Sequence, residues 1–375
     1  MPEPASRDHT LGDAPDHSPA TSPVLRQHGY HSLRVKRVVH ETHDASSFTL
    51  EVPAELEEAF RYQAGQFCTF RVHLGGEDHL RSYSMSSAPA TDSDLTVTVK
   101  RVAEGLVSNW FLDAVEENSV LELTKPAGVF CPRETEQAEA RPLLGFCGGS
   151  GVTPVISVAK QVLATTTRPV RLLYANRDRS SVIFDSTLDA LVAAHPEQLE
   201  VEHHLDSDGG FLRADEVSAF AHRFDAPGAD LYVCGPAPFM DLVETTLHGL
   251  GVPPERIFIE RFLVEQQEKD AALTVADAGG ADVTTEVTVI LGGKTHVMRY
   301  QRGDTILETA RRGGLRPPFS CESGNCATCM AFLKDGAVDM RVNNALTPEE
   351  LDEGWILTCQ GLPTSETVTV EYEPM

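Results

Sequence analysis

The chain has 375 residues, which is too many for one hydrophobic core, and we expect three domains. Its 56 acidic side chains outnumber 31 basic ones, and the formal net charge of -25 excludes nucleic acid and anionic membrane surfaces as natural partners. The sequence has no run of about 18 apolar residues that could span a bilayer, so we expect a soluble protein. The excess of negative charge suggests a protein partner with a basic docking face.

Residues 1–28 are rich in Pro, Ser, Asp and His and have almost no apolar periodicity, which predicts a disordered tail. Its histidines have no cysteine partners at ligand spacing, so we assign no metal there. The N-terminus has no signal-peptide pattern, and we therefore expect a cytoplasmic protein whose thiols stay reduced.

Residues 29–137 contain short alternating or β-branched runs separated by Gly, Pro and Asp turns, which predict an antiparallel β-barrel. Arg81 and Tyr83 are two residues apart on one such run and therefore share a face, which could hold a diphosphate and a planar ring. Beyond Lys100, a glycine and exposed amides open a helix over residues 105–110, and a helix N-terminus is a ready phosphate site. A short motif alone is weak evidence, because a strand tyrosine more often packs than stacks on a cofactor.

Residues 138–265 alternate strands with helices, which predicts an α/β domain built on an open parallel sheet. The turn after its first strand is glycine-rich and lets the backbone approach a pyrophosphate at a helix start. Cys234, Gly235 and Pro236 follow the last core strand, at the sheet edge where ligands bind. A glycine-rich turn by itself is only a turn, and Cys234 could be an ordinary buried residue.

Residues 266–283 are rich in Ala, Gly and Asp and predict a linker, and the final domain covers residues 284–375. The chain has eight cysteines, and the four in this final domain have the spacing of a plant-type two-iron, two-sulfur cluster: Cys321, Cys326, Cys329 and Cys359. A structural zinc usually pairs two short Cys-x2-Cys units, and a disulfide pair does not suit the cytoplasm, so the cluster is the favoured interpretation.

The barrel motifs resemble the flavin domain of the ferredoxin-NADP reductase superfamily. This resemblance implies that Arg81 pairs with a flavin phosphate, that Tyr83 packs on the isoalloxazine and that Ser84 approaches the flavin N5. It also implies FAD rather than FMN, because a diphosphate turn is present. The cofactor-binding residues after the strand are then Lys100, Gly105, Leu106, Val107 and Ser108.

The second domain resembles the NAD(P)H half of the same superfamily. The implied nucleotide-binding residues are Gly148, Gly149, Ser150, Gly151, Thr153, Arg177, Cys234, Gly235 and Pro236. Thr153 and Cys234 would lie near the nicotinamide, and Glu260 and Phe262 would close the domain beside the flavin, so with Ser84 they form the expected catalytic set. Asp178 would repel a 2'-phosphate whereas Arg177 and Arg179 would attract it, so the preference for NADH over NADPH rests on the resemblance.

Residues 284–375 resemble a plant-type ferredoxin, which implies a small α+β domain of the β-grasp type. The whole domain order resembles the reductase components of multicomponent oxygenases, which pass electrons from NAD(P)H through FAD and the cluster to a terminal oxygenase. We expect such a chain to act as a monomer. An alternative of another class is a passive iron–sulfur or zinc-scaffold protein without reductase activity.

Two oxygenase systems fit this resemblance. The reductase components of actinobacterial 3-ketosteroid 9α-hydroxylases are favoured, on segments 60–62, 95–101, 108–110, 174–178 and 351–360. The reductase components of phenylacetyl-CoA epoxidases share the domain order and are the alternative. A run of acids just before Cys359 could dock the oxygenase or be a solvated helix face, and both interpretations stay open: Glu349, Glu350, Asp352 and Glu353.

Overall fold

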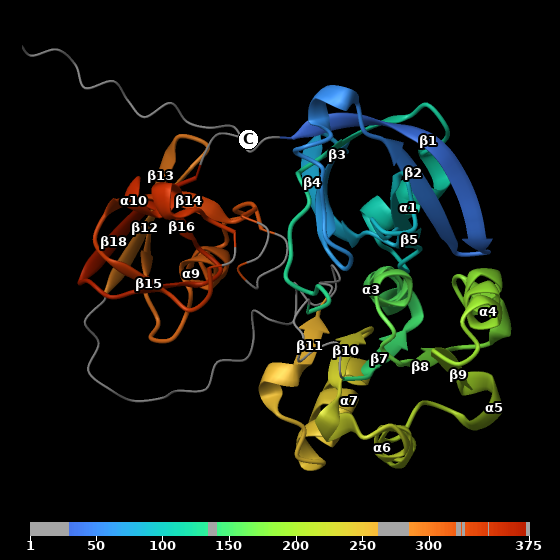
Figure 1. Cartoon of the computed structure of the whole chain (residues 1–375). Helices are drawn as coiled ribbons and strands as arrows, with labels where there is room; N and C mark the ends of the chain where they lie inside the picture. The colour runs from blue at the N-terminus through green and yellow to red at the C-terminus, as the bar shows by residue number, and fades with distance from the viewer. Residues whose placement is uncertain are drawn as a thin grey trace, which may run out of the picture.

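The structure is a computed structural model and describes residues 30–133, 141–261, 285–319, 324, 327–343 and 345–372. The predicted tail and linker lie outside the described residues, as do Phe262, Cys321 and Cys326. Figure 1 shows an all-β body, an α/β body and a smaller mixed body in chain order. Within the described ranges, no helix is long and apolar enough to cross a membrane.

The first body is a six-stranded antiparallel sheet in the order β4-β3-β6-β1-β2-β5, closed around one core. The rings of Phe48, Phe70 and Tyr83 meet the ring of Phe111, at centroid distances of 5.3, 5.4 and 5.2 Å, so the helix α1 that carries Phe111 plugs the barrel. The elements are β1 (His31–Thr42), β2 (Ala45–Glu51), η1 (Ala54–Leu56), β3 (Phe67–Leu74), β4 (Glu77–Ser84), β5 (Leu95–Lys100), α1 (Leu106–Ala114) and β6 (Val120–Leu123).

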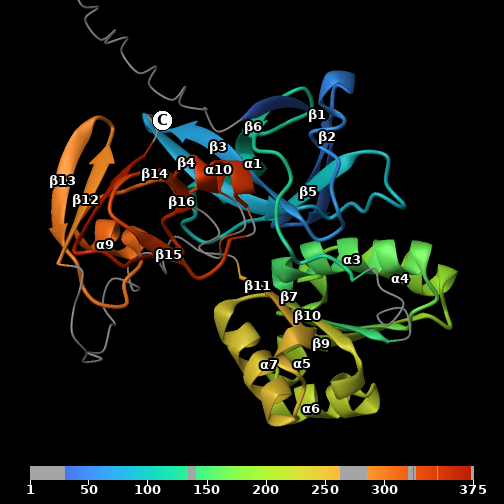
Figure 2. The same ribbon diagram turned by 60° about the vertical axis from the view of Figure 1, so that its left-hand side comes forward.

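The second body is a parallel sheet in the order β11-β10-β7-β8-β9, with helices on both faces. Alternate residues of the strands serve opposite layers: Cys147 and Tyr174 pack with α3 and α4, whereas Phe146 and Leu173 pack with α6 and α7 (Figure 2). Its strands are β7 (Leu143–Gly148), β8 (Val170–Asn176), β9 (Leu199–Leu205), β10 (Asp230–Cys234) and β11 (Ile257–Glu260). Its helices are η2 (Gly149–Gly151), α3 (Val152–Thr165), η3 (Arg179–Ser181), α4 (Asp185–Ala194), α5 (Asp206–Gly209), α6 (Ala214–Arg223), η4 (Ala226–Gly228), α7 (Ala237–Gly249) and η5 (Pro254–Arg256).

The third body is a mixed sheet in the order β13-β12-β18-β14-β16 that packs against α9. Val287 and Val289 of the first strand face Val368 and Val370 of the last, because β12 and β18 run parallel in direct register. Its elements are β12 (Glu286–Leu291), β13 (Lys294–Arg299), α9 (Ile306–Arg312), β14 (Met330–Asp335), β15 (Val338–Met340), α10 (Pro348–Asp352), β16 (Trp355–Leu357), β17 (Gly361–Pro363) and β18 (Thr367–Glu371).

The predicted fold class is therefore confirmed in all three parts. The sequence did not predict β6 or the first half of β4. The helix expected after the glycine-rich turn is α3, which begins at Val152 because the 3-10 turn η2 leads directly into it.

Candidate functional site

The barrel and the parallel sheet are joined by buried polar contacts along the first turns of α3. The hydroxyl of Ser157 donates to the carbonyl of Ser87 at 2.6 Å and accepts from the amide of Gly65 at 3.1 Å. Ser87 also shares a 2.6 Å hydrogen bond with Tyr62, and burial raises the pKa of Tyr62 to about 12, so that phenol stays protonated. These contacts fix the end of β4 relative to the start of α3, and the candidate site lies at that junction.

The last residues of β4 form the flavin side of the site. Tyr83 is half-buried, with its ring packed edge-on against Phe70 and Phe111, so the core fixes its orientation. Arg81 lies two residues earlier on the same strand face. The N-terminus of α1 follows β5 nearby, and Gly105 at its N-cap has no side chain to cover the first-turn amides. The arginine and the helix start can together hold a flavin diphosphate, and the tyrosine ring can pack on the planar ring of the flavin.

The Ser108 side chain forms hydrogen bonds within its own turn. Its hydroxyl accepts from the amide of Val102 at 3.1 Å and donates to the carbonyl of Gly105 at 3.3 Å, and the residue is buried. Ser108 therefore shapes the turn that precedes α1. Gly105 is required there, because a Cβ would lie 2.7 Å from the Ser108 hydroxyl and 2.9 Å from Val102. The groups that this turn offers to a phosphate are the backbone amides at the start of α1.

The glycine-rich turn of the parallel sheet fits closely against the end of β10. A Cβ on Gly151 would lie 2.1 Å from the carbonyl oxygen of Cys234, so only glycine permits this approach. Gly149 has φ +53°, and among the described residues only the amine of Lys100, at 3.9 Å, lies within 4 Å of the place where its Cβ would be. The open side of Gly149 can therefore admit a pyrophosphate to the backbone. Thr153 donates to the carbonyl of Ser150 at 3.0 Å, which holds the turn on the helix start.

Ser84 and Glu260, two of the predicted catalytic residues, link the two bodies by a hydrogen bond. The Ser84 hydroxyl donates to the Glu260 carboxylate at 2.8 Å, although the residues are 176 positions apart in sequence. Glu260 ends β11, and its neighbour in register on β10 is Cys234, whose own neighbour on β7 is Cys147. Burial raises the pKa of the Cys234 thiol well above its ordinary value, and Glu260 adds to that rise. Cys234 is therefore a neutral packing group here rather than a thiolate nucleophile.

The described half of the cluster site is a pair of cysteines at neighbouring strand ends. Cys329 precedes β14 and Cys359 follows β16, and both are buried. The amide of Thr358 donates to the carbonyl of Cys329 at 3.2 Å, and Gln360 donates to the Cys359 sulfur at 3.6 Å. Gly324 has φ +77°, and a Cβ there would lie 2.7 Å from the Val342 carbonyl. Two buried cysteines at neighbouring strand ends, a donor to one sulfur and the left-handed backbone of Gly324 fit an iron–sulfur cluster.

Family models match each body separately. Residues 32–131 match an oxidoreductase FAD-binding domain, residues 146–245 an oxidoreductase NAD-binding domain, and residues 289–364 a 2Fe-2S iron–sulfur cluster binding domain. The chain is 39% identical to the ferredoxin reductase component of 3-ketosteroid-9-alpha-monooxygenase from Mycolicibacterium smegmatis, over 91% of this chain and 96% of that protein. It belongs to this family of oxygenase reductases.

More distant relatives have the same organisation. One component of the 1,2-phenylacetyl-CoA epoxidase from Escherichia coli is 31% identical over 92% of this chain and 98% of its own length. The solved structure of phthalate dioxygenase reductase, described as modular for electron transfer from pyridine nucleotides to [2Fe-2S], aligns with a TM-score of 0.55 and 26% identity. That alignment covers 92% of this chain and 98% of the other. The reductase thus carries FAD-binding, NAD-binding and cluster-binding domains in one chain.

Arg177 of the reductase lies just after β8 and points to the flavin side of the junction. One guanidinium nitrogen lies 2.8 Å from a carboxylate oxygen of Asp44, in the turn between β1 and β2. The same carboxylate lies 3.8 Å from the amine of Lys100. Burial lowers the pKa of Lys100, and Asp44 counteracts that effect. Sequence reasoning identified Arg177 and Lys100 but missed Asp44, because no local pattern marks a carboxylate whose partners lie in another domain.

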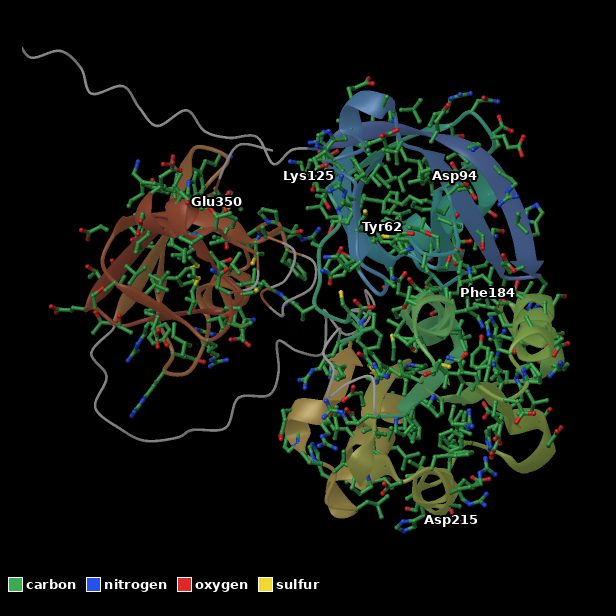
Figure 3. The ribbon with its side chains drawn as sticks, viewed as in Figure 1. Tyr62, Asp94, Lys125, Phe184, Asp215 and Glu350 are labelled. Atoms are coloured by element: carbon green, nitrogen blue, oxygen red, sulfur yellow. The ribbon has the colours of Figure 1, made fainter. Side chains whose placement is uncertain are left out.

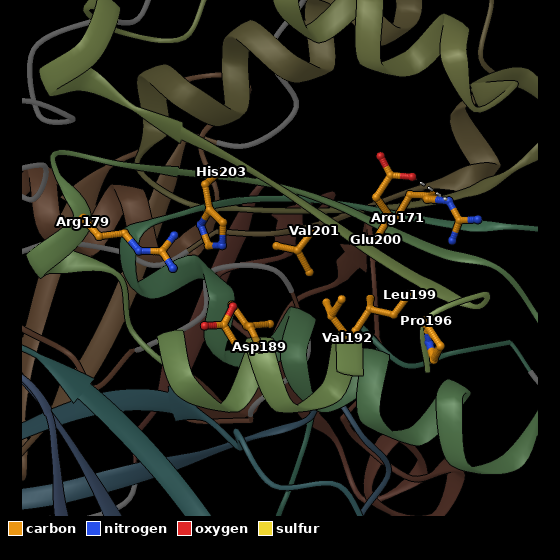
Figure 4. Close-up of a pocket in the computed structure, with 10 residues that line it drawn as sticks. Arg171, Arg179, Asp189, Val192, Pro196, Leu199, Glu200, Val201 and His203 are labelled. Atoms are coloured by element: carbon orange, nitrogen blue, oxygen red, sulfur yellow. Dashed lines mark ion pairs between the residues drawn. The ribbon is translucent and has the colours of Figure 1, made fainter. Parts of the chain in front are cut away.

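A pocket of about 420 Å³ lies elsewhere, between β9 and α4 (Figure 4). Arg179, Asp189 and His203 line one end of it, and Arg171 and Glu200 line the other. Burial lowers the pKa of His203, and the neighbouring Arg179 lowers it further. Since β9 and β11 are opposite edges of the sheet, this pocket is separate from the Ser84–Glu260 centre, and it contains no residue of the predicted catalytic set.

Proposed function

We propose that this reductase draws electrons from NADH and delivers them singly to the terminal oxygenase of a 3-ketosteroid 9α-hydroxylase. The observation that carries the proposal is the 39% identity, across all three domains, to a ketosteroid monooxygenase reductase, against 31% to the epoxidase component. When bound, FAD supplies the exchange between two-electron and one-electron transfer. We expect the reductase to act as a monomer, and reduced thiols with a nicotinamide coenzyme suit the cytoplasm.

Each part of the junction has a role in this reaction. Arg81 and the first turn of α1 would neutralise the flavin diphosphate, and Tyr83, oriented by the barrel core, would support the ring. The turn from Gly149 to Gly151 would receive the coenzyme pyrophosphate at the start of α3. Thr153 and the neutral Cys234 would border the nicotinamide and exclude water from it.

The Ser84–Glu260 hydrogen bond would position a hydroxyl at the flavin N5. Because the Ser84 hydroxyl donates a hydrogen bond to Glu260, its oxygen keeps lone pairs, and with FAD bound these would be available to the flavin N5 as hydrogen-bond acceptors. Glu260 can then take up or return the proton that accompanies electron delivery. Hydride transfer needs the two rings within contact distance. These residues would therefore act by orientation, by exclusion of water and by holding a proton at Glu260, and none of them would form a covalent bond.

The acidic face of the ferredoxin domain supports docking to a basic oxygenase surface. Thr347 and Glu350 form the predicted capping box of α10, with Glu350 accepting from the Thr347 amide at 2.9 Å, so Glu350 already has a structural role (Figure 3 labels it). Glu349, Asp352 and Glu353 remain exposed on the same segment. The docking role and the solvated helix face are distinguished by the salt dependence of oxygenase reduction.

Reconstitution tests the function. The purified reductase is mixed with NADH and, in separate reactions, with the terminal components of a ketosteroid hydroxylase and a phenylacetyl-CoA epoxidase, and product is measured. We expect FAD and cluster absorbance, NADH-dependent ferricyanide reduction, and efficient coupling to the ketosteroid component alone. Coupling to the epoxidase instead would overturn the choice of oxygenase. Absence of FAD, or of NADH oxidation, would overturn the reductase itself and favour the passive carrier.

A further inference from the structure

Asp44 is an unusually well-held carboxylate at the junction of the flavin and nicotinamide domains. It lies in the short turn between β1 and β2, and the tip of that hairpin reaches down to the α/β body in Figure 1. Its side chain is only 12% exposed, and one oxygen accepts from the Thr42 hydroxyl at 2.8 Å. Its carbonyl accepts from the amide of Arg101 at 2.7 Å, which fixes the backbone as well. The carboxylate is therefore built into the junction rather than free to leave it.

The partner of Asp44 lies where dinucleotide-binding sheets choose between coenzymes. Arg177 directly follows β8, the strand after the glycine-rich turn, and in such sheets an acid there meets the ribose 2'-hydroxyl whereas an arginine accommodates a 2'-phosphate. Here the guanidinium of Arg177 donates to Asp44 at 2.8 Å. The next residue, Asp178, accepts from the Ser180 hydroxyl and the Ser181 amide, and Arg179 pairs with Asp185 at 2.7 Å.

We propose that Asp44 is a specificity-determining residue that restricts the reductase to NADH, by holding Arg177 away from a 2'-phosphate. The carboxylate cancels the charge that would attract the phosphate, and it would itself repel a phosphate brought within reach. Lys100, 3.8 Å from Asp44 and 3.9 Å from the Cβ position of Gly149, lies instead beside the turn that receives the diphosphate common to both coenzymes. Asp44 thus discriminates against NADPH while leaving the shared diphosphate contacts in place. This inference rests on the proposed nicotinamide-dependent function.

The test is the binding of NAD+ and NADP+ to the FAD-loaded reductase, measured by calorimetry for the wild type, for Asp44→Asn and for the double variant Asp44→Asn/Arg177→Gln. Asparagine keeps the shape of the Asp44 side chain and can still accept from the Thr42 hydroxyl, but it removes the negative charge that holds the Arg177 guanidinium. We expect Asp44→Asn to tighten NADP+ about tenfold or more, the size of a new charge-assisted contact, with NAD+ changed less than about twofold. The double variant should lose that gain, because the released arginine is the group that binds the 2'-phosphate.

Asp94→Asn is the matched control, because Asp94 also forms an ion pair in the flavin domain, with Lys36 at 2.8 Å. Figure 3 labels Asp94 on the barrel. If Asp94→Asn gains as much NADP+ affinity as Asp44→Asn, the gain is caused by the lower net negative charge of the protein, and the proposal is overturned. An unchanged NADP+ affinity in Asp44→Asn would overturn it too, while NADH oxidation by the wild type would leave the proposed function standing. A wild type that oxidises neither coenzyme would refute the proposed function instead.

Arg177→Gln alone covers the case in which Asp44→Asn does not fold. If Asp44 already occupies Arg177, this variant should leave the ratio of NADP+ to NAD+ affinity within about twofold of the wild type. A fall of that ratio of about tenfold would mean that Arg177 binds the 2'-phosphate in the natural protein, which would overturn the proposal. Steady-state kinetics should agree, with the change in the KM for NADPH and little change in kcat.

Discussion

Replacing Gly151 with alanine should damage the nicotinamide half of the reductase and spare the flavin half. The added Cβ would lie 2.1 Å from the carbonyl oxygen of Cys234, against 3.4 Å for an ordinary contact, and 2.6 Å from the amide nitrogen of Gly235. Both obstacles are backbone atoms, so no rotamer change relieves the overlap, and the turn must move away from β10. Overpacking of this kind costs about 1–3 kcal/mol, and we expect the upper end of that range.

Alanine substitutions at two further glycines serve as comparisons for Gly151→Ala. Gly149→Ala meets only the Lys100 amine, at 3.9 Å, but requires φ +53° of a side-chain-bearing residue, which costs about 1–2 kcal/mol. Gly249→Ala, at the end of α7, meets nothing within 4 Å and should change stability by less than about 0.5 kcal/mol. The expected order of harm is therefore Gly151, then Gly149, then Gly249.

The assays are thermal unfolding, FAD content and the KM for NADH with ferricyanide as acceptor. Gly151→Ala should lower the melting temperature and raise the KM about tenfold or more, while FAD content stays at the wild-type level. If Gly151→Ala binds NADH like the wild type at an unchanged melting temperature, the close approach of the turn to β10 is wrong. Equal damage from Gly249→Ala would show general fragility instead.

Three other predictions follow from the same contacts. Ser84→Ala removes the donor to Glu260 and should slow flavin reduction by NADH roughly tenfold, measured by stopped flow, at unchanged FAD content; an unchanged rate would contradict the positioning role. Arg168→Met removes the positive charge that lies 2.9 Å from the fully buried carboxylate of Asp230, and should lower the free energy of unfolding in urea by about 3–5 kcal/mol. The double variant Arg168→Met/Asp230→Leu should regain most of that free energy. An equal loss of stability in both variants would argue against the ion pair as the cause. Neutralising the exposed acids of the α10 segment should slow oxygenase reduction at low salt and flatten its salt dependence, and unchanged rates would favour a solvated helix face: Glu349, Asp352 and Glu353.

The sequence predicted the architecture because each domain has a strong periodic signal. Alternating runs identify the barrel, buried strands alternating with helices identify the parallel sheet, and the cysteine spacing identifies the ferredoxin domain. The four residues of β6 were missed because so short a segment carries no periodic signal. The first half of β4 was missed because Glu77, Asp78 and His79 are polar residues of an edge strand, where alternation is weak.

The candidate site was predictable where a motif lies on one element and not where two domains meet. Ser84 and Glu260 were both predicted, but only the fold reveals the 2.8 Å hydrogen bond between them. Ser157 and Asp44 gave no signal, because a serine in a helix and an aspartate in a turn are common and their partners in the other domain, Ser87 and Arg177, are 70 and 133 residues away. The resemblance implied a cofactor-binding turn that ends at Ser108, and only the fold reveals that the Ser108 hydroxyl forms hydrogen bonds inside that turn.

Anaerobic stopped flow of the wild type and Cys329→Ser, with NADH and the terminal oxygenase present, tests the electron route most directly. Cys329 is buried beside Cys359, and a hydroxyl is a poor substitute for a soft thiolate ligand, so the variant should lose cluster absorbance. We expect its flavin to be reduced by NADH at the wild-type rate, with ferricyanide reduction intact and oxygenase reduction almost abolished. Oxygenase reduction at the wild-type rate in a variant without cluster absorbance would show that electrons leave the flavin directly, and would contradict the linear route.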